Sequence, residues 1–136
     1  MADVERGDYL DNEVDSIYEL GHFFLENGDL RSGEILMDGL TQVAPEFYPA
    51  WLGMAYVALL DGALEIALRC AEQAVKLAPH SIEALLYLVV CSLSSGDYNK
   101  AGTYLGEVGE KVDNEEVVDP QLIRFYRAQL IRYQNR

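Results

Sequence analysis

Leu60-Asp61-Gly62-Ala63-Leu64 is a turn-forming stretch with one counterpart earlier in the chain and another later. The earlier one is Glu26-Asn27-Gly28-Asp29-Leu30 and the later one is Ser95-Gly96-Asp97-Tyr98, so that the glycines at 28, 62 and 96 stand 34 residues apart. A glycine at the end of a helix can adopt the left-handed conformation that closes the helix. Each stretch therefore predicts a turn between two antiparallel helices.

The same interval governs other positions of the chain. Small residues recur at Gly33, Ala67 and Ala101, and prolines recur at Pro45 and Pro79. Small side chains are needed where two helices cross closely, so these positions are expected on the second helix of each pair. The predicted repeats cover residues 14–47, 48–81 and 82–115, and the third has Asp113 in place of the proline.

A period of 34 residues is typical of the tetratricopeptide (TPR) repeat, which consists of a helix, a turn and a second helix. The chain resembles this family over residues 14–115, including Trp51, the aromatic residue characteristic of the first helix. The resemblance implies an all-α fold, in which three TPR repeats form a short right-handed superhelix. The third repeat is a divergent copy.

The two ends of the chain lie outside the repeats. Asp119-Pro120 predicts a helix start after a repeat domain of residues 14–118, and residues 119–136 are expected to form a C-terminal capping helix. Its apolar face would cover the open end of the repeats, and its arginines would face water. The acidic segment 1–13 has few apolar side chains and is expected to be flexible or to fold only against a partner.

The composition excludes several classes of protein. A net charge of −13 would repel nucleic acid and anionic lipid, and the apolar stretches are too short to span a bilayer. Cys70 and Cys91 have no metal-ligand spacing, so we expect neither a disulfide nor a zinc site, and both thiols are expected in helix packing. Residues 1–8 are acidic and precede no apolar run, so no export signal is expected and a cytoplasmic location is favoured.

No catalytic constellation is present in the sequence. His22 and His80 lie in different repeats, and neither stands beside a nucleophile motif. His22 and Glu26 are one helical turn apart, a spacing that is common on ordinary helices. We therefore expect no enzyme activity and no cofactor or metal.

The resemblance to TPR proteins implies a binding groove on the concave side, lined by the first helix of each repeat. Carried over position by position, the groove residues are almost all apolar or aromatic: Tyr18, His22, Leu25, Leu52, Tyr56, Leu59, Leu86, Val90 and Leu93. Such a lining predicts a groove for an extended segment or an amphipathic helix of another protein. The alternative is that the chain's own tail or C-terminal helix fills the groove.

One TPR subfamily is disfavoured by these residues. Co-chaperones that grip the C-terminal carboxylate of heat-shock proteins use lysine, arginine and asparagine, whereas the corresponding positions here hold Tyr18, His22, Gly53, Glu83 and Tyr87. An acidic protein without those cations has no partner for a buried carboxylate.

The chain is also similar to the small TPR chaperones of bacterial type III secretion systems. The segments that carry this resemblance are Ile17–Gly21 followed by Gly28-Asp29-Leu30, Phe47–Ala55, and Cys91–Asp97. The resemblance implies a bacterial cytoplasmic chaperone that sequesters an aggregation-prone secretion substrate, either a needle subunit or a translocator. A second small co-chaperone and self-association without cargo are both compatible with it. A different class, a TPR adaptor that docks folded proteins within an assembly, remains the alternative.

Overall fold

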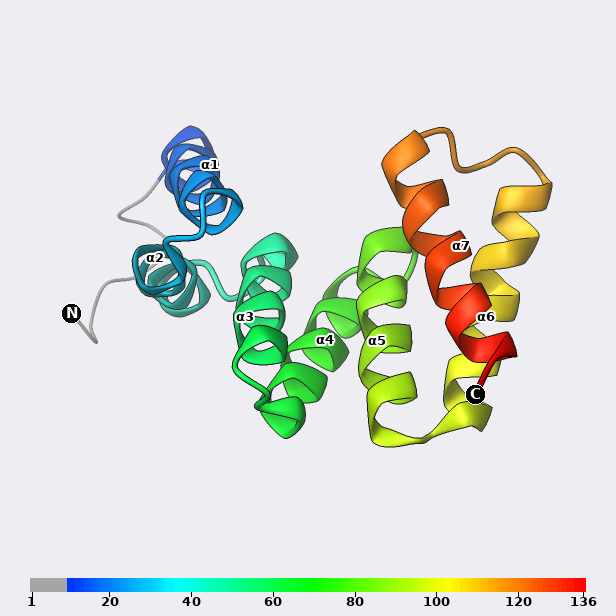
Figure 1. Cartoon of the computed structure of the whole chain (residues 1–136). Coiled ribbons are helices and arrows are strands. Elements are labelled where there is room, and N and C mark those ends of the chain that lie inside the picture. Colours follow the sequence, from blue (N-terminus) through cyan, green and yellow to red (C-terminus); the bar gives the residue numbers. More distant parts are fainter. Residues whose placement is uncertain (1–9) are drawn as a thin grey trace.

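A computed structural model describes residues 10–136, and this part of the chain contains seven α-helices and no strand. The helices are α1 (Asp11–Glu26), α2 (Leu30–Val43), α3 (Tyr48–Leu60), α4 (Leu64–Leu77), α5 (Ile82–Ser95), α6 (Tyr98–Asp113) and α7 (Pro120–Gln134). Figure 1 shows the pairs following one another across the molecule from α1 to α6, with α7 returning to lie between α5 and α6 in this view. Each of the first six packs most extensively on its partner within a pair, α1 with α2, α3 with α4 and α5 with α6. The predicted all-α fold of helix-turn-helix repeats is thereby confirmed.

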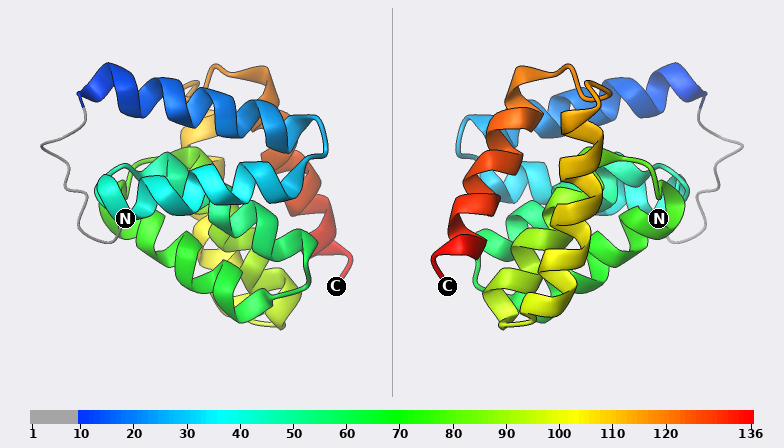
Figure 2. Two further views of the ribbon diagram at one scale, coloured as in Figure 1. Left: turned by 90° about the vertical axis from the view of Figure 1, so that its left-hand side faces the viewer. Right: turned by 90° about the vertical axis from the view of Figure 1, so that its right-hand side faces the viewer.

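The three repeated glycines close the first helix of each pair. Gly28, Gly62 and Gly96 have φ angles of +82°, +75° and +81°, in the left-handed region that favours glycine. The two views of Figure 2 show the resulting antiparallel hairpins stacked side by side.

The helices approach one another through small side chains. Ala67 and Ala101 are completely buried, and a Cβ atom on Gly33 would collide with the Leu25 side chain. The predicted close crossing at these positions is confirmed. Both cysteines are free and buried, as helix packing requires.

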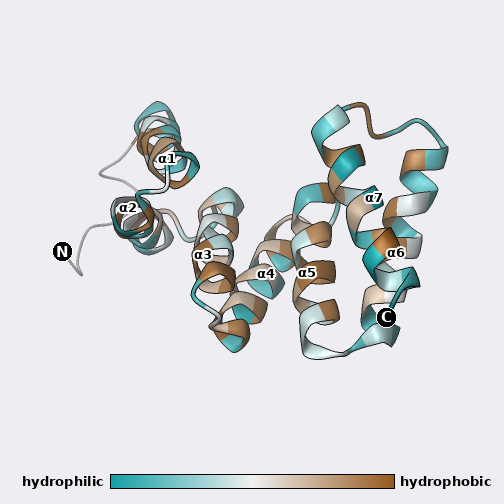
Figure 3. Ribbon diagram, in the orientation of Figure 1, coloured by the Kyte–Doolittle hydropathy of each residue, from teal (hydrophilic) through white to brown (hydrophobic). Residues whose placement is uncertain are grey.

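The middle of the repeat array holds the most apolar helices. α3 and α5 are rich in hydrophobic residues, drawn in brown in Figure 3, and each packs against its own pair partner and also against neighbouring pairs. The interior therefore runs through the array as a series of small adjoining clusters.

Helix α7 packs against both α5 and α6 and closes the array. A Cβ atom on Gly109 or Gly102 would lie 2.6 Å from the hydroxyl of Tyr126 or Tyr133, so both glycines make room for α7. The arginines of this C-terminal segment are all exposed, as expected. Arg132 donates a hydrogen bond of 2.8 Å to the Ser94 hydroxyl, and the Arg136 guanidinium lies 4.1 Å from the centroid of the Tyr133 ring.

The N-terminal segment that is expected to be flexible comprises residues 1–13. Of these, residues 1–9 lie outside the described part of the chain. Residues 11–13 form the first turn of α1, where the Glu13 side chain accepts a hydrogen bond of 3.1 Å from the Leu10 backbone N–H. The segment that was expected to be flexible therefore overlaps α1 by these three residues. Within residues 10–136, no helix combines the length and the apolar character needed to cross a membrane.

Candidate binding pocket

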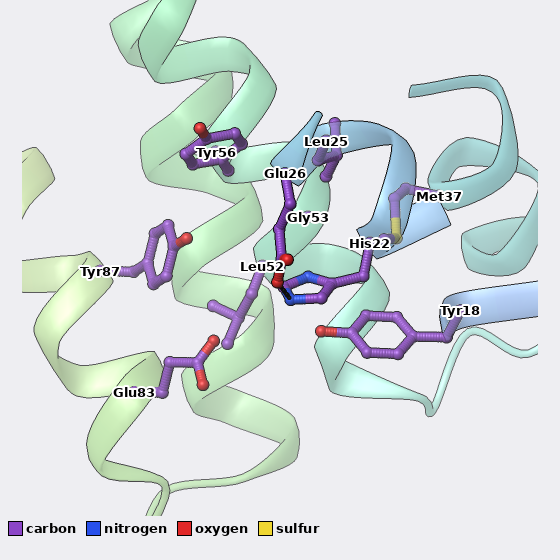
Figure 4. A pocket seen from close by; sticks show the side chains of 10 residues that line it. All are labelled: Tyr18, His22, Leu25, Glu26, Met37, Leu52, Gly53, Tyr56, Glu83 and Tyr87. Atoms are coloured by element: carbon purple, nitrogen blue, oxygen red, sulfur yellow. Dashed lines mark ion pairs between the residues drawn. The ribbon is translucent and has the colours of Figure 1, made fainter. Parts of the chain in front are cut away.

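A pocket of about 160 Å³ opens between the first helices of the three repeats (Figure 4). Helix α1 supplies one wall, α3 the second and α5 the third, and Met37 of α2 reaches the floor. The ten residues that line it are Tyr18, His22, Leu25, Glu26, Met37, Leu52, Gly53, Tyr56, Glu83 and Tyr87.

The floor of the pocket is apolar and rigidly packed. Leu25, Met37 and Leu52 are buried there. A Cβ atom on Gly53 would lie 2.7 Å from both the Cγ and the Sδ atoms of Met37, so only glycine lets α3 approach α2 this closely. Overpacking of a well-filled interior costs about 1–3 kcal/mol, which explains why this position holds no larger residue.

The rim of the pocket is aromatic and polar. The Tyr18 ring stacks on the His22 ring with a centroid distance of 5.8 Å and meets the Phe47 ring edge-on at 5.4 Å. His22 also forms an ion pair with Glu26, and both side chains are more than half exposed, at 52% and 64%. The mouth of the pocket is therefore open to solvent.

Tyr87 connects the pocket to the closing helix. On its far side the Tyr87 ring meets Phe125 of α7 edge-on, with a centroid distance of 5.9 Å. Aromatic pairs of this geometry contribute roughly 0.5–1.5 kcal/mol beyond the area that they bury. Helix α7 thus holds one wall of the pocket in place.

Burial shifts the titration of several groups in the pocket. It raises the pKa of the Tyr18 hydroxyl to about 12, with the Glu83 carboxylate as the next cause. Burial also raises the pKa of Tyr87, and again the Glu83 charge adds to the rise. The pKa of Glu83 itself is raised by burial, while His22 opposes this rise and Asp119 adds to it. Glu83 is exposed as a whole residue, but its carboxyl group points inward, beside these rings (Figure 4).

Five of the nine residues predicted to line the groove meet in this pocket: Tyr18, His22, Leu25, Leu52 and Tyr56. The other four lie elsewhere. Leu86 is completely buried beside Val108 of α6 and Phe125 of α7, and Leu93 is buried in the cluster around Leu105. Leu59 packs half-buried in the cluster around Leu88, and Val90 is half-buried on α5 without reaching the pocket.

The placement of Leu86 and Leu93 on an exposed groove is corrected by their burial. The prediction took the same positions from every repeat, but in this array those positions face the next helix along. Leu52 fills the space between α3 and α5, and Leu86 fills the equivalent space between α5 and α7. The α5 residues that line the pocket are instead Glu83 and Tyr87, which lie on the side of α5 that faces α1 and α3.

The other five lining residues of the pocket are not among the predicted groove residues. The sequence marks Gly53, Glu83 and Tyr87 only as positions that lack the cations of a carboxylate-binding groove, and Glu26 only as a neighbour of His22. All four line the pocket. Met37 was not singled out, because it comes from a second helix, which the groove prediction did not consider.

Fold and site together define an all-α helical repeat protein with an open, aromatic pocket between the first helices of its repeats. No family model and no curated protein sequence matches the chain. Among solved structures, it is similar to a chain of the CopN-Scc3 complex, with a TM-score of 0.70 and 12% sequence identity. The match covers 90% of this chain and 70% of that chain. At this identity the similarity shows the fold alone, a helical repeat.

Proposed function

We propose that this protein is a cytoplasmic type III secretion chaperone of bacteria, with no enzyme activity. It holds a hydrophobic, aggregation-prone secretion substrate, a needle subunit or a translocator, against the first helices of its repeats. The observation that carries this proposal is the pocket between α1, α3 and α5, which joins a buried apolar floor to an open aromatic rim.

Two further features support the proposal. The fold is similar to that of a chain solved as part of a complex of two proteins. The net charge of −13 would keep a complex with an apolar substrate dispersed in solution. An export component with a self-assembling helix must be blocked before export, and contact with the pocket and its surroundings buries such a helix.

Affinity capture followed by reconstitution tests this function. The tagged wild-type protein is expected to capture a small secreted subunit from its native cytosol. The purified subunit should then stay monomeric in light scattering only while the wild-type protein is present in equimolar amount.

Variants locate the binding surface in the same experiment. Tyr56→Ala removes a half-buried ring of the pocket and is expected to weaken subunit binding at least tenfold, since buried aromatic anchors dominate most interfaces. Ile66→Ala is the matched control, because Ile66 is 47% exposed on α4 and lies outside the pocket. Equal loss in both variants, or retention by both, would contradict the pocket as the binding site. Capture of large folded proteins instead would favour an adaptor.

A further inference from the structure

Apart from His22, which pairs with Glu26, the polar groups of the pocket suit a positively charged ligand. Two of its ten lining residues are carboxylates, Glu26 on α1 and Glu83 on α5, and none is a lysine or an arginine. Three are tyrosines, whose ring faces attract cations. The net charge of −13 adds a negative long-range field to that of the two carboxylates, and this field raises the rate at which a cation reaches the pocket.

Glu83 is the residue that most needs such a ligand. Across residues 10–136, no hydrogen bond or ion pair of the structure reaches its carboxylate, although burial already disfavours the charge and raises its pKa. The basic group that acts on it is His22, which pairs with Glu26 instead. A partly desolvated carboxylate without a partner is unfavourable, and an incoming cation would relieve that cost.

The size and floor of the pocket decide what kind of cation fits. A pocket volume of about 160 Å³ accommodates one long side chain but no helix. The buried floor of Leu25, Met37 and Leu52 favours an aliphatic stem beneath the charged group. In Figure 4 the Tyr18 and Tyr87 hydroxyls and the Glu83 carboxylate lie around the same central space.

We propose that this pocket binds an arginine side chain of the protein partner, with the guanidinium between Glu83 and Glu26 and flanked by the tyrosine rings. Arginine fits better than lysine, because its planar fork offers five donors to several acceptors, stacks on aromatic rings and is weakly hydrated. This assignment rests on the proposed protein-binding function and specifies which residue of the partner enters the pocket. It also modifies the expectation of a groove whose lining is almost all apolar or aromatic.

The assignment is tested with small probes on the full chain. Nα-acetyl-arginine methylamide is titrated against the ¹⁵N-labelled protein, beside the citrulline analogue, which has nearly the same shape but no charge. We expect chemical-shift changes confined to the pocket residues, and binding of the arginine probe at least tenfold tighter than that of citrulline. The lysine analogue should bind between the two. Equal binding of arginine and citrulline, or shifts spread over the acidic surface, would overturn the assignment.

Isosteric glutamine variants identify which carboxylates bind the arginine probe. Glu26→Gln/Glu83→Gln is expected to reduce arginine binding to the citrulline level. Glu65→Gln/Glu107→Gln removes the same charge from exposed positions on α4 and α6 and should bind like the wild type. A loss of the same size in both double variants would show a general charge effect and no arginine site. Far-UV circular dichroism checks that both variants keep their helices.

The same variants separate this inference from the proposed function. If the captured subunit binds Glu26→Gln/Glu83→Gln as tightly as the wild type, the arginine assignment is overturned while the chaperone function stands. If no subunit is captured, yet the arginine probe binds the pocket and the double variant does not, the assignment is supported and the chaperone function is contradicted.

Discussion

At the scale of single residues, burial and charge around Tyr87 make the protein sensitive to alkaline pH. Its ordinary pKa is 10.0, and burial raises the value in the folded state, with Glu83 and Tyr18 as further causes. Above pH 10 the unfolded chain therefore loses this proton before the folded chain does. The contribution of the protonated Tyr87 hydroxyl to the free energy of unfolding is complete below pH 10, and it is lost as pH rises through the folded pKa.

Tyr87→Phe is expected to remove this loss. Each pH unit between the two pKa values lowers the free energy of unfolding by up to about 1.4 kcal/mol for one group. Phenylalanine keeps the ring contact with Phe125 but has no proton to lose. Urea denaturation near pH 7 should give similar free energies of unfolding for the variant and the wild type. Near pH 11 the free energy of unfolding should have fallen less for the variant than for the wild type. If the free energy of unfolding fell equally for both proteins, Tyr87 would not be the cause of the loss of stability at alkaline pH.

At the scale of elements, the repeat shows directly what a helix cap contributes. Asp29 and Asp97 occupy the N-cap positions of α2 and α6, and each accepts a hydrogen bond from a backbone N–H of the first turn, at 3.2 and 3.1 Å. The equivalent position of α4 is Ala63, which has no side-chain acceptor. Its φ and ψ angles of −86° and 69° nearly equal those of Asp97, −86° and 78°.

Ala63→Asp is therefore expected to stabilise the protein by roughly 0.5–1.5 kcal/mol, because the backbone already has the geometry of a capped helix. The reverse substitution, Asp97→Ala, should destabilise by a similar amount. Equilibrium denaturation of both variants beside the wild type measures the two changes. A destabilising Ala63→Asp would mean that contacts of Ala63 with the neighbouring interior outweigh the cap.

At the scale of the whole molecule, α7 is a structural part of the array and no detached tail. None of its residues is fully buried, yet it covers Leu86 and Val108, which are completely shielded from solvent. It also supports Tyr87 and therefore the pocket wall.

Ending the chain after Val118 is expected to lower the free energy of unfolding by roughly 3 kcal/mol or more, since exposure of one leucine alone costs about 1.5–3 kcal/mol. The new apolar surface should also cause self-association, visible in size-exclusion chromatography. Ending the chain after Gln134 is the control and should change little, although the Arg136 ring contact is lost. A truncated chain that melts with the wild type and stays monomeric would contradict the role assigned to α7.

The amino-acid sequence by itself determined the helix pairs and their order. Gly28, Gly62 and Gly96 predict the turns because only glycine adopts a positive φ without strain, and this requirement is local. The start of α7 at Asp119-Pro120 is equally local, since the Asp119 side chain accepts a hydrogen bond of 2.9 Å from the Gln121 N–H. Five of the nine groove residues that the resemblance to TPR proteins implies lie in the pocket.

Only the tertiary structure decided which faces of these helices meet and which remain open. Leu52 and Leu86 occupy equivalent positions of two repeats, and both are buried, because each fills the space before the next helix. Glu83 and Tyr87 line the pocket, whereas the α5 residues that the resemblance to TPR proteins implies do not. Periodicity specifies a position along one helix, whereas the exposure of a side chain depends on its neighbours, which come from distant parts of the chain.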